Sequence, residues 1–225
     1  LLEVTRDTEK LVREAQAEVD RAKETLTVKA QALKKVRVAA APKLCDAVTK
    51  QMSHLQMGSA QIELNFEDLP FEQWNKVGST KIELMYKPSA QMTARPLRKI
   101  ASGGEVSRVM LACKVVLGES DVCDTLVFDE VDAGVGGATA VALAEVLAQL
   151  AKTHQVIVVT HLPQVAVMAS KQYVVSKTEE HNALPITSLT EVSGTQREEE
   201  IARMLSGSIT EASLAHAHEL LSEVR

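Results

Sequence analysis

Two adjacent carboxylates, Asp129 and Glu130, follow the mostly apolar segment 125–128. An acidic side chain at the carboxyl end of a parallel strand lies where α/β proteins bind their ligands. Asp129 there can hold Mg²⁺ directly or through water, because Mg²⁺ takes few protein ligands and keeps several waters. Glu130 can orient or deprotonate an attacking water. The alternative is that the pair only begins an exposed loop, since acidic residues often follow apolar strands.

A second candidate is the turn Ser102-Gly103-Gly104-Glu105, which precedes a helical pattern. Its two glycines let the backbone approach a ligand closely, and the N-terminus of the next helix presents free N–H groups and the positive end of its dipole. These features predict a loop that binds phosphate. The alternative is a turn that only caps the helix, a position at which serine is preferred.

His161 comes directly after a second apolar segment, 155–160, so we expect it at the same edge of the sheet as Asp129. Its imidazole there would hydrogen-bond a phosphate oxygen or a water. The alternative is that His161 only caps a short helix, which we expect to begin at Pro163.

These three groups would be positioned by apolar strands that alternate with helices. We expect strands at 125–128 and 155–160, and helices at about 106–117, 139–152 and from 163 onward. Near-continuous apolar strands alternating with helices indicate an α/β fold with a parallel sheet covered on both faces. A strand pair over 172–192 and two helices, near 197–205 and 210–224, would complete this part of the chain.

A long helix is expected over residues 1–50, and we place 51–225 in a second domain. Small and apolar residues, with one threonine, repeat along the helix every 11 residues: Val4, Thr8, Leu11, Ala15, Val19, Ala22, Leu26, Ala30 and Leu33. Such a repeat keeps one stripe facing a partner. So narrow a stripe needs a partner helix, and none is obvious in the sequence.

Between residues 61 and 86 the hydrophobic period changes to two. Apolar side chains alternate with polar ones at Ile62, Leu64 and Phe66, and again at Ile82, Leu84 and Tyr86. This alternation predicts two strands joined by a loop.

The charge distribution narrows the classes of partner. The net charge of −5 argues against nucleic-acid binding by the whole chain. Two basic stretches, 21–37 and 76–99, contain six cations each against a single glutamate. They could meet phosphates, although solvated helix and loop faces carry similar charge.

The absence of a targeting or membrane-spanning pattern and the cysteine content indicate a cytosolic location. No targeting segment is visible, and the longest apolar stretch is too short to span a bilayer. The three cysteines lack the spacing of a metal site and fit the reduced thiols of a cytosolic protein.

Together, the order and spacing of these segments resemble the second half of the ABC-type ATPase heads found in SMC-like proteins. Residues 101–105 resemble the signature loop, 125–130 the Walker B strand with its catalytic glutamate, 131–134 the D-loop, and 160–161 the switch histidine. Three longer strings, 99–108, 128–137 and 160–166, are similar to the RecN family of bacterial DNA-repair proteins. The helix at 1–50 fits the returning arm of that family's coiled coil.

The resemblance implies an SMC-like ATPase that uses ATP and Mg²⁺ in double-strand-break repair and recombination. Two heads of a homodimer would hold ATP between them, with DNA, double-strand ends in particular, as the further partner. The implied location is the bacterial cytoplasm, in association with the nucleoid.

The family's site roles carry over onto matching positions of this sequence. Asp129 would serve Mg²⁺, Glu130 would position the attacking water, and His161 would contact the γ-phosphate region. Asp132 would act across the dimer. The nucleotide held by the opposite head would be contacted by the signature loop through Ser102, Gly103, Gly104 and Glu105.

One departure from the family pattern limits the interpretation: the sequence contains no G-x-x-x-x-G-K-[ST] motif. Without that Walker A loop the chain cannot cradle the β- and γ-phosphates in its own site. We therefore expect an inactive C-terminal fragment, beginning at Leu1 rather than Met, whose missing N-terminal half supplies the loop. The alternatives are a non-catalytic coiled-coil or DNA-interaction module, and another SMC-like ATPase.

Overall fold

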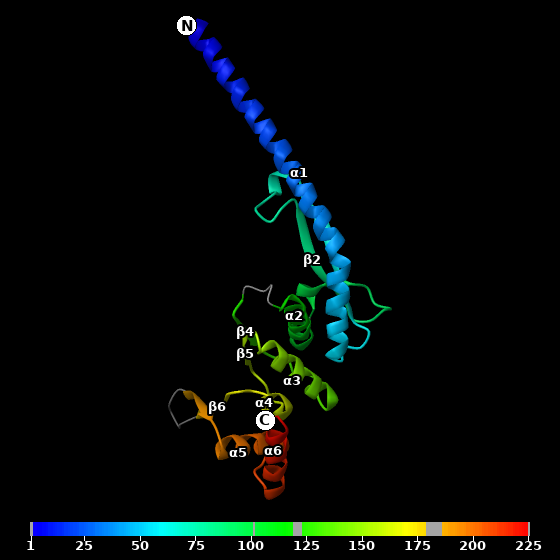
Figure 1. Ribbon diagram of the computed structural model, residues 1–225, viewed down its shortest axis with the longest axis vertical. Helices are drawn as coiled ribbons and strands as arrows, with labels where there is room; N and C mark the ends of the chain where they lie inside the picture. The colour runs from blue at the N-terminus through cyan, green and yellow to red at the C-terminus, as the bar shows by residue number, and fades with distance from the viewer. Residues whose placement is uncertain (1, 101, 119–122, 179–185, 225) are drawn as a thin grey trace. The chain divides into compact units, whose positions relative to one another are not determined.

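The computed structural model describes residues 2–100, 102–118, 123–178 and 186–224 (Figure 1). The chain forms two compact units. Unit 1 comprises Leu1–Asp46 and Gln61–Pro96, and unit 2 comprises Ala47–Ala60 and Leu97–Arg225. Helix α1 (Leu2–His54) continues past Pro42 and contributes to both units.

Unit 1 contains the two strands expected from the alternating pattern. Strand β1 (Gln61–Asp68) pairs antiparallel with β2 (Thr80–Lys87), in register from Gln61↔Lys87 to Asp68↔Thr80. Ile62 and Tyr86 face each other across this pair and are 4% and 2% exposed. A short strand, β3 (Arg95–Pro96), adds to the free edge of β2, and a 3₁₀ turn, η1 (Phe71–Gln73), lies in the connecting loop.

The β1–β2 hairpin covers one face of α1. The Lys34 ammonium contacts the Asp68 carboxylate at 2.6 Å, and Arg37 Nη1 donates to the carbonyl of Val77 at 2.7 Å. The apolar stripe expected from the sequence only partly coincides with this face, since Ala30 is buried while Leu26 remains 48% exposed. The physical reason is that this face also contains long cations, which reach acceptors on the hairpin, beside the stripe residue Leu33 next to Gly78.

Unit 2 holds the parallel sheet. Strand β4 (Thr125–Phe128) pairs in parallel with β5 (Gln155–Val158), as the sequence predicted. Helices α2 (Gly103–Leu117) and α3 (Ala138–Leu150) contribute many of the buried side chains, among them Val109, Leu111, Leu143 and Leu147. Met52 and Leu55, at and just beyond the end of α1, are also buried in this unit.

The expectation that both faces of this sheet are covered is wrong for the described chain. Val127, Ile157 and Val159 are 66%, 46% and 59% exposed, whereas Leu126 and Phe128 are buried. Successive side chains of a strand point to opposite faces, so one face of this sheet is buried and the other stays open. The sequence identified strands that are apolar on both sides, but it did not show that one side is exposed in the described residues.

The C-terminal part of unit 2 contains a strand pair and a helix pair. Strand β6 (Gln172–Thr178) pairs antiparallel with β7 (Ile186–Val192), while the expected connection at 179–185 lies outside the described residues. Lys171 and Tyr173 hydrogen-bond the carboxylate of Glu191 and hold its pKa below the ordinary value.

Two helices, α5 (Thr195–Ser206) and α6 (Glu211–Glu223), lie side by side and pack against the short helix α4 (Pro163–Ala166) (Figure 1). Their shared core consists of Ala166, Val167, Ile201, Ala202 and Ala217. Among the described residues, no helix is both long enough and apolar enough to cross a membrane.

Candidate functional site

Asp129 and Glu130 lie at the carboxyl end of β4, both exposed. The neighbouring strand end is held beside them, because Val159 N donates to Phe128 O at 2.9 Å. Glu130 has a φ of +56°, a left-handed conformation that few non-glycine residues adopt. Backbone strain of this kind persists only where the surroundings impose it, and it concentrates at functional sites.

The signature-like turn begins α2 directly against this strand end. Ser102 caps the helix, accepting a hydrogen bond from Glu105 N at 3.3 Å, so the capping interpretation describes its side chain correctly. The glycines do more than turn the chain. A Cβ on Gly104 would lie 2.9 Å from Ala133 Cβ, and a Cβ on Gly103 would collide with the Glu130 carboxylate. Ala101, the first residue of the loop, lies outside the described residues.

Two side chains of α2 hydrogen-bond to the backbone of the turn that follows β4. Ser107 Oγ donates to the carbonyl of Asp129 at 2.9 Å, and Arg108 Nη1 donates to the carbonyls of Val131 and Ala133 at 3.2 and 2.9 Å. Sequence reasoning did not assign these roles. The available signal was spacing: Ser107 and Arg108 follow the two glycines by four residues each and therefore share their face of the helix.

Asp132 is the buried member of the site, at 3% exposure. Its Oδ2 accepts hydrogen bonds from Thr160 Oγ1 at 2.5 Å and from His161 N at 3.0 Å, and it lies 3.1 Å from His161 Nδ1. In this structure Asp132 therefore binds the segment after β5 in its own chain. The sequence placed Asp132 and His161 in one site but did not predict this contact.

His161 itself is oriented by these bonds. Its side chain is 71% exposed, and Nδ1 is the ring nitrogen turned toward Asp132. When Nδ1 donates its proton to a carboxylate, Nε2 is left to face a ligand or solvent. The segment beyond is held as well, because Leu162 N donates to Thr160 Oγ1 at 3.0 Å before α4 begins at Pro163.

The donor chemistry of this site fits magnesium and phosphate. The described residues contain no group of three or more His, Cys, Asp or Glu side chains placed to enclose a metal ion. Mg²⁺ does not need one, because it commonly binds one or two carboxylates together with substrate phosphates and waters. Asp129 offers an exposed carboxylate, and the N-terminus of α2 offers N–H groups to an anion.

The chain is similar in sequence to DNA repair proteins named RecN. It is 40% identical to that of Streptomyces coelicolor over 220 residues, which cover 93% of this chain and 38% of the relative. It is 42% identical to that of Deinococcus radiodurans over 207 residues, or 92% of this chain and 36% of the relative. The chain thus spans little more than a third of the length of these relatives. No protein-family model matches it.

Solved structures with the same fold are head domains of Smc proteins. The Smc head with a coiled coil and joint from Pyrococcus yayanosii matches 99% of this chain and 36% of its own, with a TM-score of 0.54 and 19% identity. The Smc head with an extended coiled coil from Pyrococcus furiosus matches 100% of this chain and 47% of its own, with a TM-score of 0.53 and 19% identity. The fold is therefore that of part of an SMC-type head with its coiled coil.

Proposed function

This chain is a relative of the DNA repair protein RecN, and we propose that it forms part of an SMC-like ATPase acting in DNA repair, in which it contributes half of a composite ATP site. The observation that carries this proposal is the convergence of four separate segments. The loop at 102–105, the pair Asp129-Glu130, Asp132 and His161 are joined by direct contacts at one edge of the sheet.

Each residue has a proposed role that its position supports. Asp129 binds Mg²⁺, which when bound neutralises charge on the transferring phosphate. Glu130 orients the attacking water and accepts its proton. His161 presents Nε2 toward the γ-phosphate region, because Asp132 holds Nδ1.

The signature loop acts on the second nucleotide of a head dimer. Ser102 and the glycines stand at the N-terminus of α2, where backbone N–H groups are available to a phosphate. Glu105, in the first turn, joins that surface. Asp132 acts across the dimer from the position in which its Oδ2 holds Thr160 and His161.

The open face of the β4–β5 sheet supports the composite arrangement. Parallel sheets are covered on both faces, and burying a valine or isoleucine side chain stabilises a fold by about 1.5–3 kcal/mol. This stabilisation is not gained in the described chain at three exposed side chains, Val127, Ile157 and Val159. The remaining part of a RecN-type protein would cover them and bring a Walker A loop, which this sequence lacks. The chain by itself is accordingly expected to be inactive.

DNA is the proposed partner of the same protein, and α1 offers a surface for it. One face of α1, taken at about 100° per residue, carries four exposed cations: Arg21, Lys29, Lys35 and Lys43. Lys34 and Arg37 face the hairpin instead.

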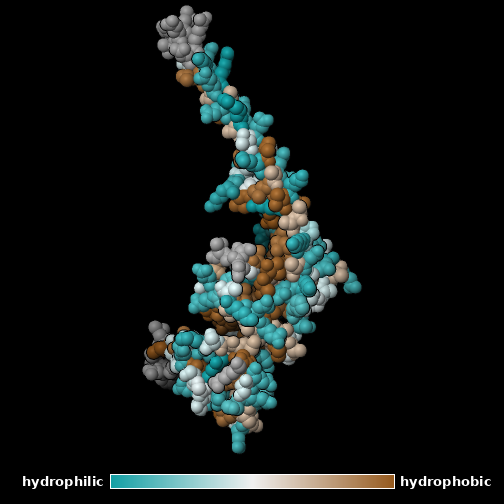
Figure 2. Space-filling model, viewed as in Figure 1, coloured by the Kyte–Doolittle hydropathy of each residue, from teal (hydrophilic) through white to brown (hydrophobic). Residues whose placement is uncertain are grey.

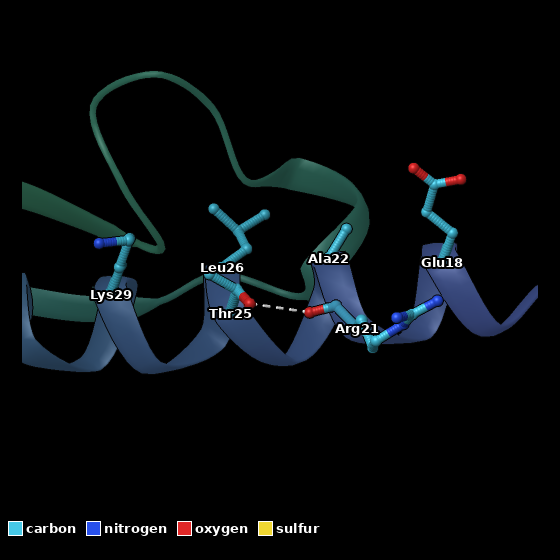
Figure 3. Close-up of a pocket in the computed structure, with 6 residues that line it drawn as sticks. All are labelled: Glu18, Arg21, Ala22, Thr25, Leu26 and Lys29. Carbon is cyan, nitrogen blue, oxygen red and sulfur yellow. Dashed lines mark hydrogen bonds between the residues drawn. The ribbon is translucent and has the colours of Figure 1, made fainter.

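The same face borders a shallow hollow. It is lined by Arg21 and Lys29 together with Glu18, Ala22, Thr25 and Leu26 (Figure 3). The visible face of this stretch carries both hydrophilic and hydrophobic residues (Figure 2). Such a row of cations suits a phosphate backbone.

The decisive experiment for the enzymatic role is Glu130→Gln in a protein that joins this chain to a Walker A half. Loss of a general base slows a reaction by about 100-fold or more, so turnover should fall at least that far while ATP stays bound. Glu145→Gln, an exposed glutamate on α3, is the matched control and should hydrolyse ATP normally. Unchanged turnover in Glu130→Gln would remove the role assigned to Glu130.

A second candidate function is a non-catalytic module in which α1 mediates assembly or DNA binding and the sheet is scaffold. The same assay separates the two. Absence of ATP turnover in the joined protein, together with DNA binding through α1, would favour the module.

A further inference from the structure

Arg197, in the first turn of α5, hydrogen-bonds the C-terminal end of α4, the helix that follows His161. Its Nη2 lies within hydrogen-bond distance of three backbone carbonyls: Ala166 at 3.1 Å, Val167 at 3.1 Å and Ala169 at 2.7 Å. Its Nε donates to Gln172 Oε1 at 3.2 Å, and Gln172 is a buried side chain at the start of β6. One guanidinium thus joins α4, β6 and α5.

The contact with Arg197 is needed because α4 is a very short helix with few hydrogen bonds of its own. It contains only Pro163–Ala166, and the last carbonyls of any helix have no partner within the helix. A guanidinium at this end both donates to those carbonyls and complements the negative end of the helix dipole. Arg197 therefore adds a charged donor to the carbonyls at the end of α4 and in the turn after it.

The other end of α4 adjoins the switch histidine. His161 is separated from Pro163 by a single residue, and its backbone N–H and Nδ1 both meet Asp132 Oδ2. A shift of α4 along its axis would move His161 relative to the buried Asp132. The carbonyl end of α4 is bound to Arg197 and packs in the shared core with Ile201 and Ala202 of α5, so α5 sets where α4 lies.

We propose that Arg197 is a positioning residue for His161: by binding the carbonyl end of α4, it holds the backbone N–H and Nδ1 of His161 on Asp132. The α5–α6 pair is then part of the machinery that keeps the switch histidine in place. The proposal rests on the proposed function only for its effect on turnover, because the contact chain itself is independent of any ligand.

Two measurements test this role with three variants. Arg197→Met keeps the length of the side chain and removes every donor, while Arg197→Lys keeps a cation that reaches fewer carbonyls. Arg203→Met is the matched control, since Arg203 lies on the same helix and its guanidinium bonds to Glu200. Hydrogen exchange at the His161 amide is measured in this chain, and kcat and KM for ATP are measured in a protein that also carries a Walker A half.

In Arg197→Met we expect exchange at the His161 amide to rise roughly tenfold, because its bond to Asp132 opens more often. We expect kcat to fall roughly tenfold with KM nearly unchanged, since the misplacement affects the reacting group rather than nucleotide binding. Arg197→Lys should fall between Arg197→Met and the unsubstituted protein in both measurements, and Arg203→Met should match the unsubstituted protein.

A merely structural role for Arg197 predicts a different pattern. The unfolding midpoint would then fall while the His161 amide and the kcat of the folded protein stayed as they were, and this result would overturn the proposal. If the unsubstituted protein hydrolyses no ATP, the proposed function fails, but the exchange measurement still decides whether Arg197 positions His161.

Discussion

Single residues of the site meet through contacts that link distant parts of the sequence. Glycine at 103 and 104 was expected from the need for close approach to a ligand, and in the structure the close approach is to Glu130 and Ala133 of the same chain. The bond between Thr160 and Asp132 spans 28 residues and has no periodic or local signal. Sequence reasoning could therefore name candidate site residues, but it could not say which of them touch.

Gly104→Ala tests the contact between the signature loop and the turn after β4. The added Cβ would lie 2.9 Å from Ala133 Cβ and 3.1 Å from the carbonyl oxygens of Glu130 and Ala133. Overpacking of this kind costs about 1–3 kcal/mol, so the free energy of unfolding in urea should fall by that amount. Gly136→Ala, where a Cβ meets nothing within 4 Å, serves as control. Equal stability of the two variants would show that the loop is not packed as described.

At the scale of elements, hydrophobic periodicity predicted most helices and strands, because it reports directly on which side chains are buried. It was less informative for α1. The face that meets the hairpin contains Lys34 and Arg37, whose charged ends reach Asp68 and a backbone carbonyl. Contacts made by long cations leave no apolar pattern. The exposed stripe residues, including Leu11 and Val19, are consistent with a coiled-coil partner outside this chain.

The exposed cations of α1 carry a prediction about DNA. Replacing Lys29 and Lys35 together by Gln should weaken binding to duplex DNA and reduce the slope of log Kd against log salt by about 0.9 for each phosphate that the protein no longer neutralises. Lys34→Gln is the control, because its ammonium is bound to Asp68. Affinity would be measured by fluorescence anisotropy at several salt concentrations. A slope that is the same in all three proteins would exclude α1 as the DNA surface.

At the scale of the whole molecule, the sequence predicted an ABC-type head with a coiled-coil helix, and the solved Smc heads share that fold. What it could not indicate was the uncovered side of the sheet. A strand that is apolar on both faces has the same pattern whether its cover comes from this chain or from elsewhere. Val127, Ile157 and Val159 are exposed on the open side of the sheet, and the sequence contains no Walker A motif.

The composite site is tested most directly by mixing two inactive variants of a protein that joins this chain to a Walker A half. Ser102→Arg disables the signature loop and Glu130→Gln disables the water-positioning carboxylate. A mixed dimer then has one intact site, built from the Glu130 of one subunit and the Ser102 of the other. When the two variants are mixed in equal amounts and their subunits exchange freely, half of the dimers are mixed. Each mixed dimer has one working site out of two, so about a quarter of normal turnover should return. Turnover that stays at the level of the separate variants would contradict a site shared between two heads.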